Sequence, residues 1–145
     1  MGDLPAAATP LSRPLPLPDD LTRPYWQAAA EGVLVVQRCQ ACGALRCPPS
    51  TSCDRCPASA HEWVRMSGVG TIYSYCVAYD TLVRGFTPPY VVAQVELPEQ
   101  PGLRITTNIV GCEPDSVSIG MPVVVTFEPV SDDIWLPQFR PVVAS

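Results

Sequence analysis

The sequence predicts a mainly β protein, in which an N-terminal helix and a cysteine-rich ribbon precede a five-stranded barrel. Three observations carry this prediction. Five short runs of strand-forming residues follow residue 70, with turn clusters between them and no helical pattern. Two C-x-x-C pairs come before these runs. The 18 prolines and 9 glycines among 145 residues limit helix length and favour short strands.

Composition bounds the class of protein. With 47% apolar and 16% charged residues, the chain can form a packed core in one domain, or in one domain with a small satellite. All nine basic residues are arginines, which excludes catalytic lysines of the Schiff-base, Walker and kinase types. A net charge of −5 with scattered arginines counts against nucleic-acid binding. No signal-peptide pattern or long apolar run is present, so we expect a cytoplasmic protein without a membrane span.

The first predicted segments are a tail and a helix. Residues 1–19 are rich in proline and are expected to form a mostly disordered tail, either without a role or lying across a partner subunit. A helix fits residues 21–31, with Asp20 or Thr22 as its cap and Gly32 closing it. Tyr25 and Trp26 near its start predict docking on an apolar surface, which belongs either to the same domain or to another chain.

Strand patterns fill the rest of the chain. A strand at 33–36 leads into the cysteines of a unit spanning 20–66. Within the unit spanning 67–145, strands fit 71–79, 90–96, 103–110 and 123–129, and a weak last strand fits 138–140. Five short strands indicate a small antiparallel barrel, because a sandwich usually needs about seven strands.

The two cysteine pairs predict a metal site. Cys39 and Cys42 form one knuckle, Cys53 and Cys56 form the second, and ten residues separate them. Two such knuckles on adjacent hairpins supply the four thiolates of a tetrahedral zinc site, and a site closed in this way is structural. Iron with the same ligands remains an alternative. A redox C-x-x-C would need a thioredoxin-like βαβ context, which is missing.

The remaining reactive residues predict no independent active site. Cys76 and Cys112 lie in apolar strand contexts and are expected to be small buried hydrophobes, while Cys47 has poorer spacing for a ligand. His61 is the only histidine and is expected to be structural or exposed. No pair of carboxylates is arranged for acid/base chemistry.

Aromatic residues outline possible contact surfaces. Tyrosines 73, 75 and 79 share one face of the first long strand and are expected to fill or cover the core. A stacking platform for nucleic acid is the alternative, but arginines are too few there. The loop at 80–89 places Arg84 beside Phe86, which suits an amphipathic ligand or a protein surface; a plain ordered turn fits equally well.

Taken in order, these features resemble the family labelled domain of unknown function 35, which joins a rubredoxin-like zinc ribbon to an acyl-CoA-associated OB-fold. The resemblance covers residues 22–142. The segments that carry it are YW at 25–26 to Gly32, both cysteine pairs, GVGTIYSY at 68–75, PPYVVA at 88–93, IGMPV at 119–123 and FRP at 139–141.

The resemblance implies a non-catalytic accessory subunit. Such proteins form hetero-oligomers with thiolase-like enzymes, namely thiolases, acyltransferases or steroid side-chain aldolases, which they stabilise and whose acyl-CoA path they help to shape. We expect Tyr25, Trp26, Arg84 and Phe86 on the surface for the partner or ligand, since interfaces are enriched in these residue types. The alternatives are a nucleic-acid-binding OB module and a stand-alone acyl-CoA carrier.

Overall fold

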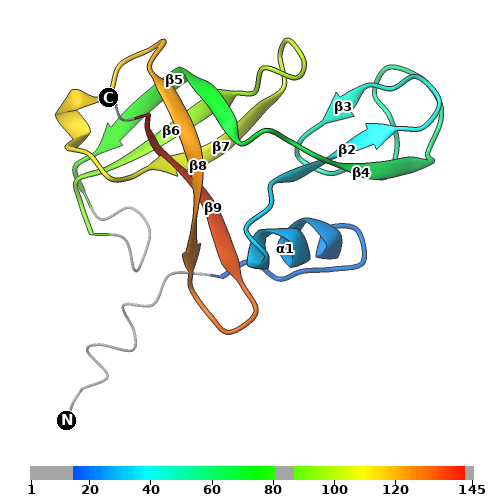
Figure 1. The fold of residues 1–145 in the computed structure, drawn as a ribbon, viewed down its shortest axis with the longest axis horizontal. Coiled ribbons are helices and arrows are strands. Elements are labelled where there is room, and N and C mark those ends of the chain that lie inside the picture. Colours follow the sequence, from blue (N-terminus) through cyan, green and yellow to red (C-terminus); the bar gives the residue numbers. More distant parts are fainter. Residues whose placement is uncertain (1–14, 81–86, 143–145) are drawn as a thin grey trace.

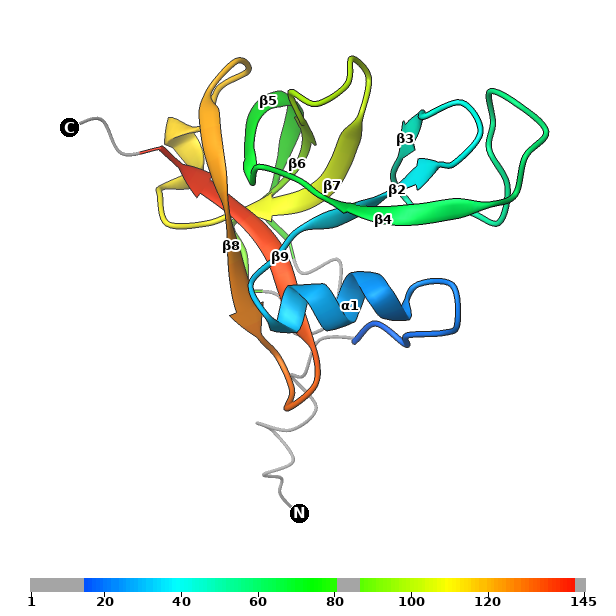
Figure 2. The same ribbon diagram turned by 45° about the vertical axis from the view of Figure 1, so that its right-hand side comes forward.

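The computed structural model describes residues 15–80 and 87–142, and it confirms the mainly β fold. Most of the predicted tail, together with Arg84 and Phe86, lies outside the described residues. The described strands form a three-stranded sheet of order β3-β2-β4 and a closed barrel of order β5-β6-β7-β9-β8. Sheet and barrel lie next to one another, and helix α1 (Arg23–Ala30) runs beneath their junction (Figures 1 and 2). In the described part of the chain, no helix has the length and apolar character needed to cross a bilayer.

Helix α1 spans Arg23–Ala30 and docks on its own domain. Thr22 is its N-cap residue, but its side chain points back: the Thr22 hydroxyl and backbone N–H both donate to Asp19 Oδ1, at 3.0 and 2.8 Å. Gly32, with φ of +78°, closes the helix as expected. Tyr25 packs against the main core, so this helix is fixed to the molecule that carries it.

The ribbon consists of β2 (Val35–Cys39), β3 (Leu45–Arg46) and β4 (His61–Arg65). All pairings are antiparallel, with Gln37 opposite Arg46 and Cys39 opposite His61. Its own buried cluster is very small: Cys39, Ala44 and Cys53, flanked by Cys56 and Ala58. Packing at the cysteine end of the ribbon is therefore limited to this small cluster, while Val36, Leu45 and Val64 of its strands contact the main core.

The barrel consists of five strands with a 3₁₀ turn, Pro114–Ser116, between the third and fourth. The strands are β5 (Val69–Ala78), β6 (Tyr90–Glu96), β7 (Arg104–Ile109), β8 (Pro122–Pro129) and β9 (Trp135–Pro141). Neighbours are antiparallel except β7 and β9, which close the barrel in parallel where Ile109 meets Phe139. The last strand is longer than predicted. β9 pairs with β8 over its full length but with β7 only at Phe139, and because the rest of that edge pairs with no described strand it tolerates prolines.

One core connects ribbon and barrel. Phe139 and Val123 are fully buried inside the barrel. Leu34 and Val36, at the entrance to the ribbon, belong to the same buried cluster, as does Met66 at the exit. The two sheets therefore share packing on both sides of their connection.

Two expectations about β5 are wrong. Cys76 is exposed instead of buried, and Tyr73 and Tyr75 point outward with 48% and 38% of their surface exposed. The cause is the way the strand leaves the barrel wall. β8 pairs with β5 only as far as Thr71, and a register shift follows between Ile72 and Ser74, so among the described strands only β6 flanks the second half of β5.

Candidate metal centre and surface grooves

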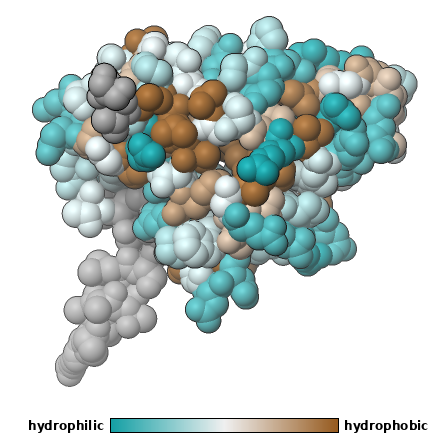
Figure 3. Space-filling model, in the orientation of Figure 1, coloured by the Kyte–Doolittle hydropathy of each residue, from teal (hydrophilic) through white to brown (hydrophobic). Residues whose placement is uncertain are grey.

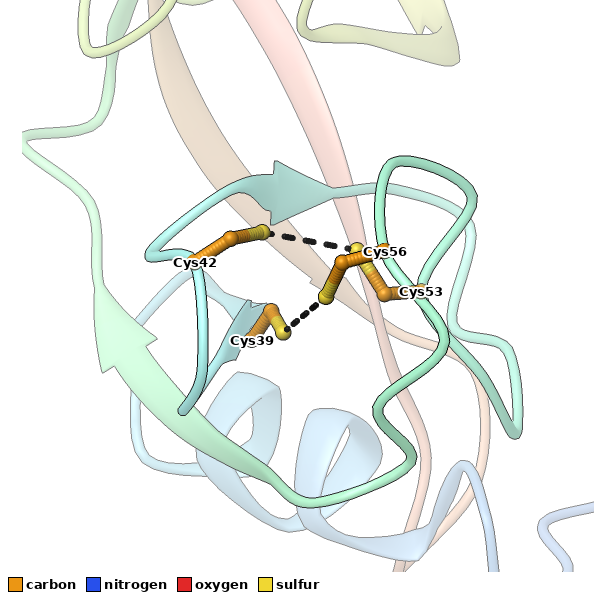
Figure 4. Close-up of side chains that lie close together, drawn as sticks. All are labelled: Cys39, Cys42, Cys53 and Cys56. Atoms are coloured by element: carbon orange, nitrogen blue, oxygen red, sulfur yellow. Dashed lines mark hydrogen bonds between the residues drawn. The ribbon is translucent and has the colours of Figure 1, made fainter.

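Four cysteine sulfurs converge at the end of the ribbon (Figure 4). Cys39 ends β2 and Cys42 follows in the turn, while Cys53 and Cys56 come from the loop between β3 and β4. All four Sγ atoms lie within 4.8 Å of one another, with Cys39–Cys56 at 3.5 Å and Cys42–Cys53 at 3.6 Å. A tetrahedral ion with bonds of about 2.3 Å to sulfur needs separations of about 3.8 Å. The four residues therefore fit a tetrahedral soft metal ion such as zinc.

Backbone geometry in the knuckles prepares the sulfurs for a cation. Gly43 has φ of +79°, which allows the first turn to close with its N–H donating to the Cys39 carbonyl at 2.9 Å. The Arg55 N–H donates to Cys53 Sγ at 3.3 Å. Backbone N–H groups of Cys42 and Ala41 lower the pKa of Cys39 to about 6, since they stabilise its thiolate.

Crowding opposes this ionisation at the fourth cysteine. The Ala58 N–H lowers the pKa of Cys56, but the Cys39 sulfur, burial, and the sulfurs of Cys42 and Cys53 together outweigh it and raise the value to about 12. Four adjacent thiolates repel one another, so full ionisation requires a cation among them. With a thiolate at every corner of the tetrahedron, such an ion has no position left for water or substrate.

The other candidates lie outside this cluster. Cys47 packs against the main core, and burial raises the pKa of its thiol to about 11. Cys112 is half-buried against the same core. The His61 ring lies edge-on to Trp63, and its Nδ1 is 3.3 Å from the Ser59 carbonyl oxygen. None of the three joins the four clustered sulfurs.

Tyr25 and Trp26 line a hollow of about 530 Å³ between α1, the ribbon and the barrel. Their rings meet edge-to-face with centroids 4.9 Å apart. Burial raises the pKa of the Tyr25 hydroxyl, because an uncharged phenol is favoured there. Tyr25 thus fixes the helix to the core, and the side chains of Tyr25 and Trp26 both border the hollow.

A second and larger hollow was missed from the sequence. It has a volume of about 1070 Å³ and lies at one end of the barrel. We call it the barrel-end groove. Four of its lining side chains are large, apolar and exposed: Val69 (44%), Tyr73 (48%), Ile119 (70%) and Val142 (47%). Figure 3 shows apolar surface gathered over the barrel. The sequence feature that could have indicated this groove is an apolar residue next to a glycine, as at Val69 and Ile119.

Arg104 stands between the two hollows and lines both. Its guanidinium stacks on the Tyr73 ring at 3.6 Å from the centroid, and its Nε donates to Glu96 Oε1 at 3.1 Å. Among the described residues that line either hollow, Arg104 is the only cation. Since that charge is already paired, the groove floor is close to neutral.

Comparison with known proteins agrees with both parts of the structure. A family model for the rubredoxin-like zinc ribbon domain of ChsH2 matches residues 26–62, and one for the C-terminal OB-fold domain of ChsH2 matches residues 63–128. A probable enoyl-CoA hydratase alpha subunit of Thermomonospora curvata is 44% identical over 119 residues, which are 82% of this chain and 37% of that protein. This chain therefore spans little more than a third of that relative.

Two further matches extend over most of the other chain. A DUF35 domain-containing scaffold protein of Methanocaldococcus jannaschii is 37% identical over 103 residues, covering 69% of this chain and 71% of the relative. A solved structure described as an Ltp2-ChsH2(DUF35) aldolase is 42% identical with a TM-score of 0.81, and the match covers 89% of this chain and all of that one. The zinc ribbon and OB-fold expected from the sequence are thus confirmed, and the chain belongs to the DUF35 family.

Proposed function

We propose that this protein is a non-catalytic accessory subunit that binds and stabilises a thiolase-like, acyl-CoA-processing enzyme. Zinc held by Cys39, Cys42, Cys53 and Cys56 stiffens its ribbon, and the reaction takes place on the partner. A relative named as a scaffold protein and a structural match described as an Ltp2-ChsH2(DUF35) aldolase support this assignment.

The observation that carries the proposal is the closed thiolate site, beside which the described residues form no second cluster of metal-ligating side chains. The four sulfurs leave an ion no open coordination position. Among the described residues, the ion pairs are Arg23–Asp20, Arg38–Glu62 and Arg104–Glu96, which are partly exposed and tie local segments together. These ion pairs support a role in holding a binding surface in shape more than a role in catalysis.

The barrel-end groove is the proposed contact surface. Exposed apolar residues that converge on one hollow mark interaction sites in soluble proteins. A nucleic acid or a CoA ester would bring several phosphates and require unpaired cations. The one described cation at the groove is already paired with Glu96. The groove therefore favours an apolar protein segment over either alternative ligand.

The test combines the purified chain with a thiolase-fold protein from the same genome, using size exclusion with light scattering. We expect a hetero-oligomer in which the enzyme is more stable to heat. Ile119→Asp should weaken the complex by about tenfold or more, since a carboxylate would be buried at an apolar contact. Tyr79→Asp is the matched control, because Tyr79 is 67% exposed and does not line the groove.

Two results would contradict the proposal. Saturable turnover of acyl-CoA thioesters by the chain alone would show that it is an enzyme. Calorimetric binding of a CoA ester to the chain alone would favour the carrier alternative. Equal weakening by both aspartate variants would refute the choice of surface only.

A further inference from the structure

A buried arginine without a carboxylate partner lies within the ribbon. Arg46, on β3, keeps only 9% of its surface exposed. Its Nε donates to Gln37 Oε1 at 2.7 Å and its Nη2 donates to the Ser50 carbonyl at 3.0 Å. Both acceptors are neutral, and no ion pair among the described residues involves Arg46. A buried cation is costly unless an opposite charge stands nearby.

The strand register places this cation next to the metal centre. Gln37 lies opposite Arg46, and Cys39 follows Gln37 by two residues on the same face of β2. The Cys39 N–H donates to the Ala44 carbonyl at 2.9 Å, so the Gln37–Arg46 pair lies two residues along the strands from the Cys39–Ala44 pair. At about 3.3 Å per residue, the two pairs are about 7 Å apart along the strands.

The same side chains also bind the segment that leads into the second knuckle. The Ser50 N–H donates to Gln37 Oε1 at 2.8 Å, and Ser50 precedes Cys53 by three residues. Gln37 is fully buried, and its Nε2 and Arg46 Nη1 find no acceptor in the described part of the chain. The guanidinium is thus held in place by hydrogen bonds, while no described carboxylate forms an ion pair with its charge.

A loaded metal centre supplies an opposite charge. Four thiolates around a divalent ion carry a net charge of −2. The acids between residues 33 and 66 are Asp54 and Glu62, and Glu62 is engaged by Arg38. We propose that Arg46 is the internal counter-charge of the metal centre, held in position by Gln37, so that metal affinity depends on it. This inference rests on the proposed metal site.

The test measures zinc affinity of the full chain by competition with a chromophoric chelator. Arg46→Met and Arg46→Gln should each weaken zinc by about tenfold or more, because the buried positive charge is lost. Arg46→Lys, which keeps a positive charge at this position, should stay within about threefold of the zinc affinity of the wild type. The effect should persist in about 1 M NaCl, since buried charges are poorly screened.

Arg38→Met is the matched control. Arg38 adjoins Cys39 in sequence, but its side chain is 46% exposed and paired with Glu62. We expect its loss to change zinc affinity by no more than about twofold, because exposed ion pairs contribute little. Cobalt substitution gives a second readout, since its charge-transfer bands report whether four thiolates still bind.

The outcomes separate the inference from its premise. If the wild type binds no zinc, the metal site fails and the inference fails with it. If the wild type binds zinc and Arg46→Gln binds it equally well, only the counter-charge is refuted. Arg46→Lys as weak as Arg46→Met also refutes it, because packing would then be the cause. Should Arg46→Met not fold, the Gln and Lys variants still decide between charge and packing.

Discussion

Removal of the metal should unfold the cysteine-bearing end of the ribbon and leave the barrel folded. The ribbon's own buried cluster holds Cys39, Cys53 and Ala44, with Cys56 and Ala58 at its edge. Burial of two alanine side chains contributes on the order of 1–2 kcal/mol. A structural zinc ion contributes about 10 kcal/mol or more in small modules of this kind. The metal term therefore dominates over packing in this part of the molecule.

The barrel has an independent source of stability. Its core includes Phe139, Val123, Val95 and Ile72, all with no more than 1% of their surface exposed. These side chains lie on barrel strands and make no use of the cysteine cluster. Loss of the ion should therefore abolish order around the four cysteines while the barrel keeps its fold.

Amide NMR spectra before and after chelation test this reasoning. Ala44 and Ser52 should lose chemical-shift dispersion, whereas Val95 and Val123 should keep theirs. Cys56→Ser should reproduce the chelated spectrum, and Cys76→Ser should match the wild type because Cys76 is exposed and outside the cluster. Ribbon amides that stay dispersed and protected from exchange without metal would refute the argument.

Two further predictions concern the core and the helix. Phe139→Ala should lower the free energy of unfolding by about 3–5 kcal/mol in urea titrations, because it leaves a cavity at a fully buried site; a loss below about 1 kcal/mol would contradict the barrel core described here. Burial raises the pKa of Tyr25 above its ordinary value of 10.0, so the stability it contributes is present below pH 10 and is lost as the pH rises further. Tyr25→Phe should remove this alkaline loss, as measured by urea midpoints at pH 9 and pH 11; an identical alkaline loss in the variant would show that another group is responsible.

Regular patterns made much of the fold predictable. Short runs of strand-forming residues located four barrel strands closely and the last one only in part, and turn residues separated them. The spacing of Cys39, Cys42, Cys53 and Cys56 singled out the four residues whose sulfurs converge. Both signals are local, so they need no knowledge of which segments meet in space.

The remaining features depend on contacts between distant segments. Cys76 is exposed because β8 stops flanking β5 early, and this follows from the length of another strand. The barrel-end groove joins Val69, Ile119 and Val142, which are far apart in sequence. Gln37 and Arg46 read as ordinary polar strand residues, and only the folded ribbon shows that they are buried together. Partner contacts predicted at Arg84 and Phe86 lie outside the described residues and stay predictions.

The junction between ribbon and barrel leaves little room for a hinge. Strand β4 passes into β5 through three residues, Met66 to Gly68. The Met66 N–H donates to the Leu34 carbonyl at 2.8 Å, and the Val125 N–H donates to the Gly68 carbonyl at 2.7 Å. The angle between the two lobes is thus set before any encounter. A partner protein would therefore bind a preformed arrangement of ribbon and barrel, and little conformational entropy would be lost on binding.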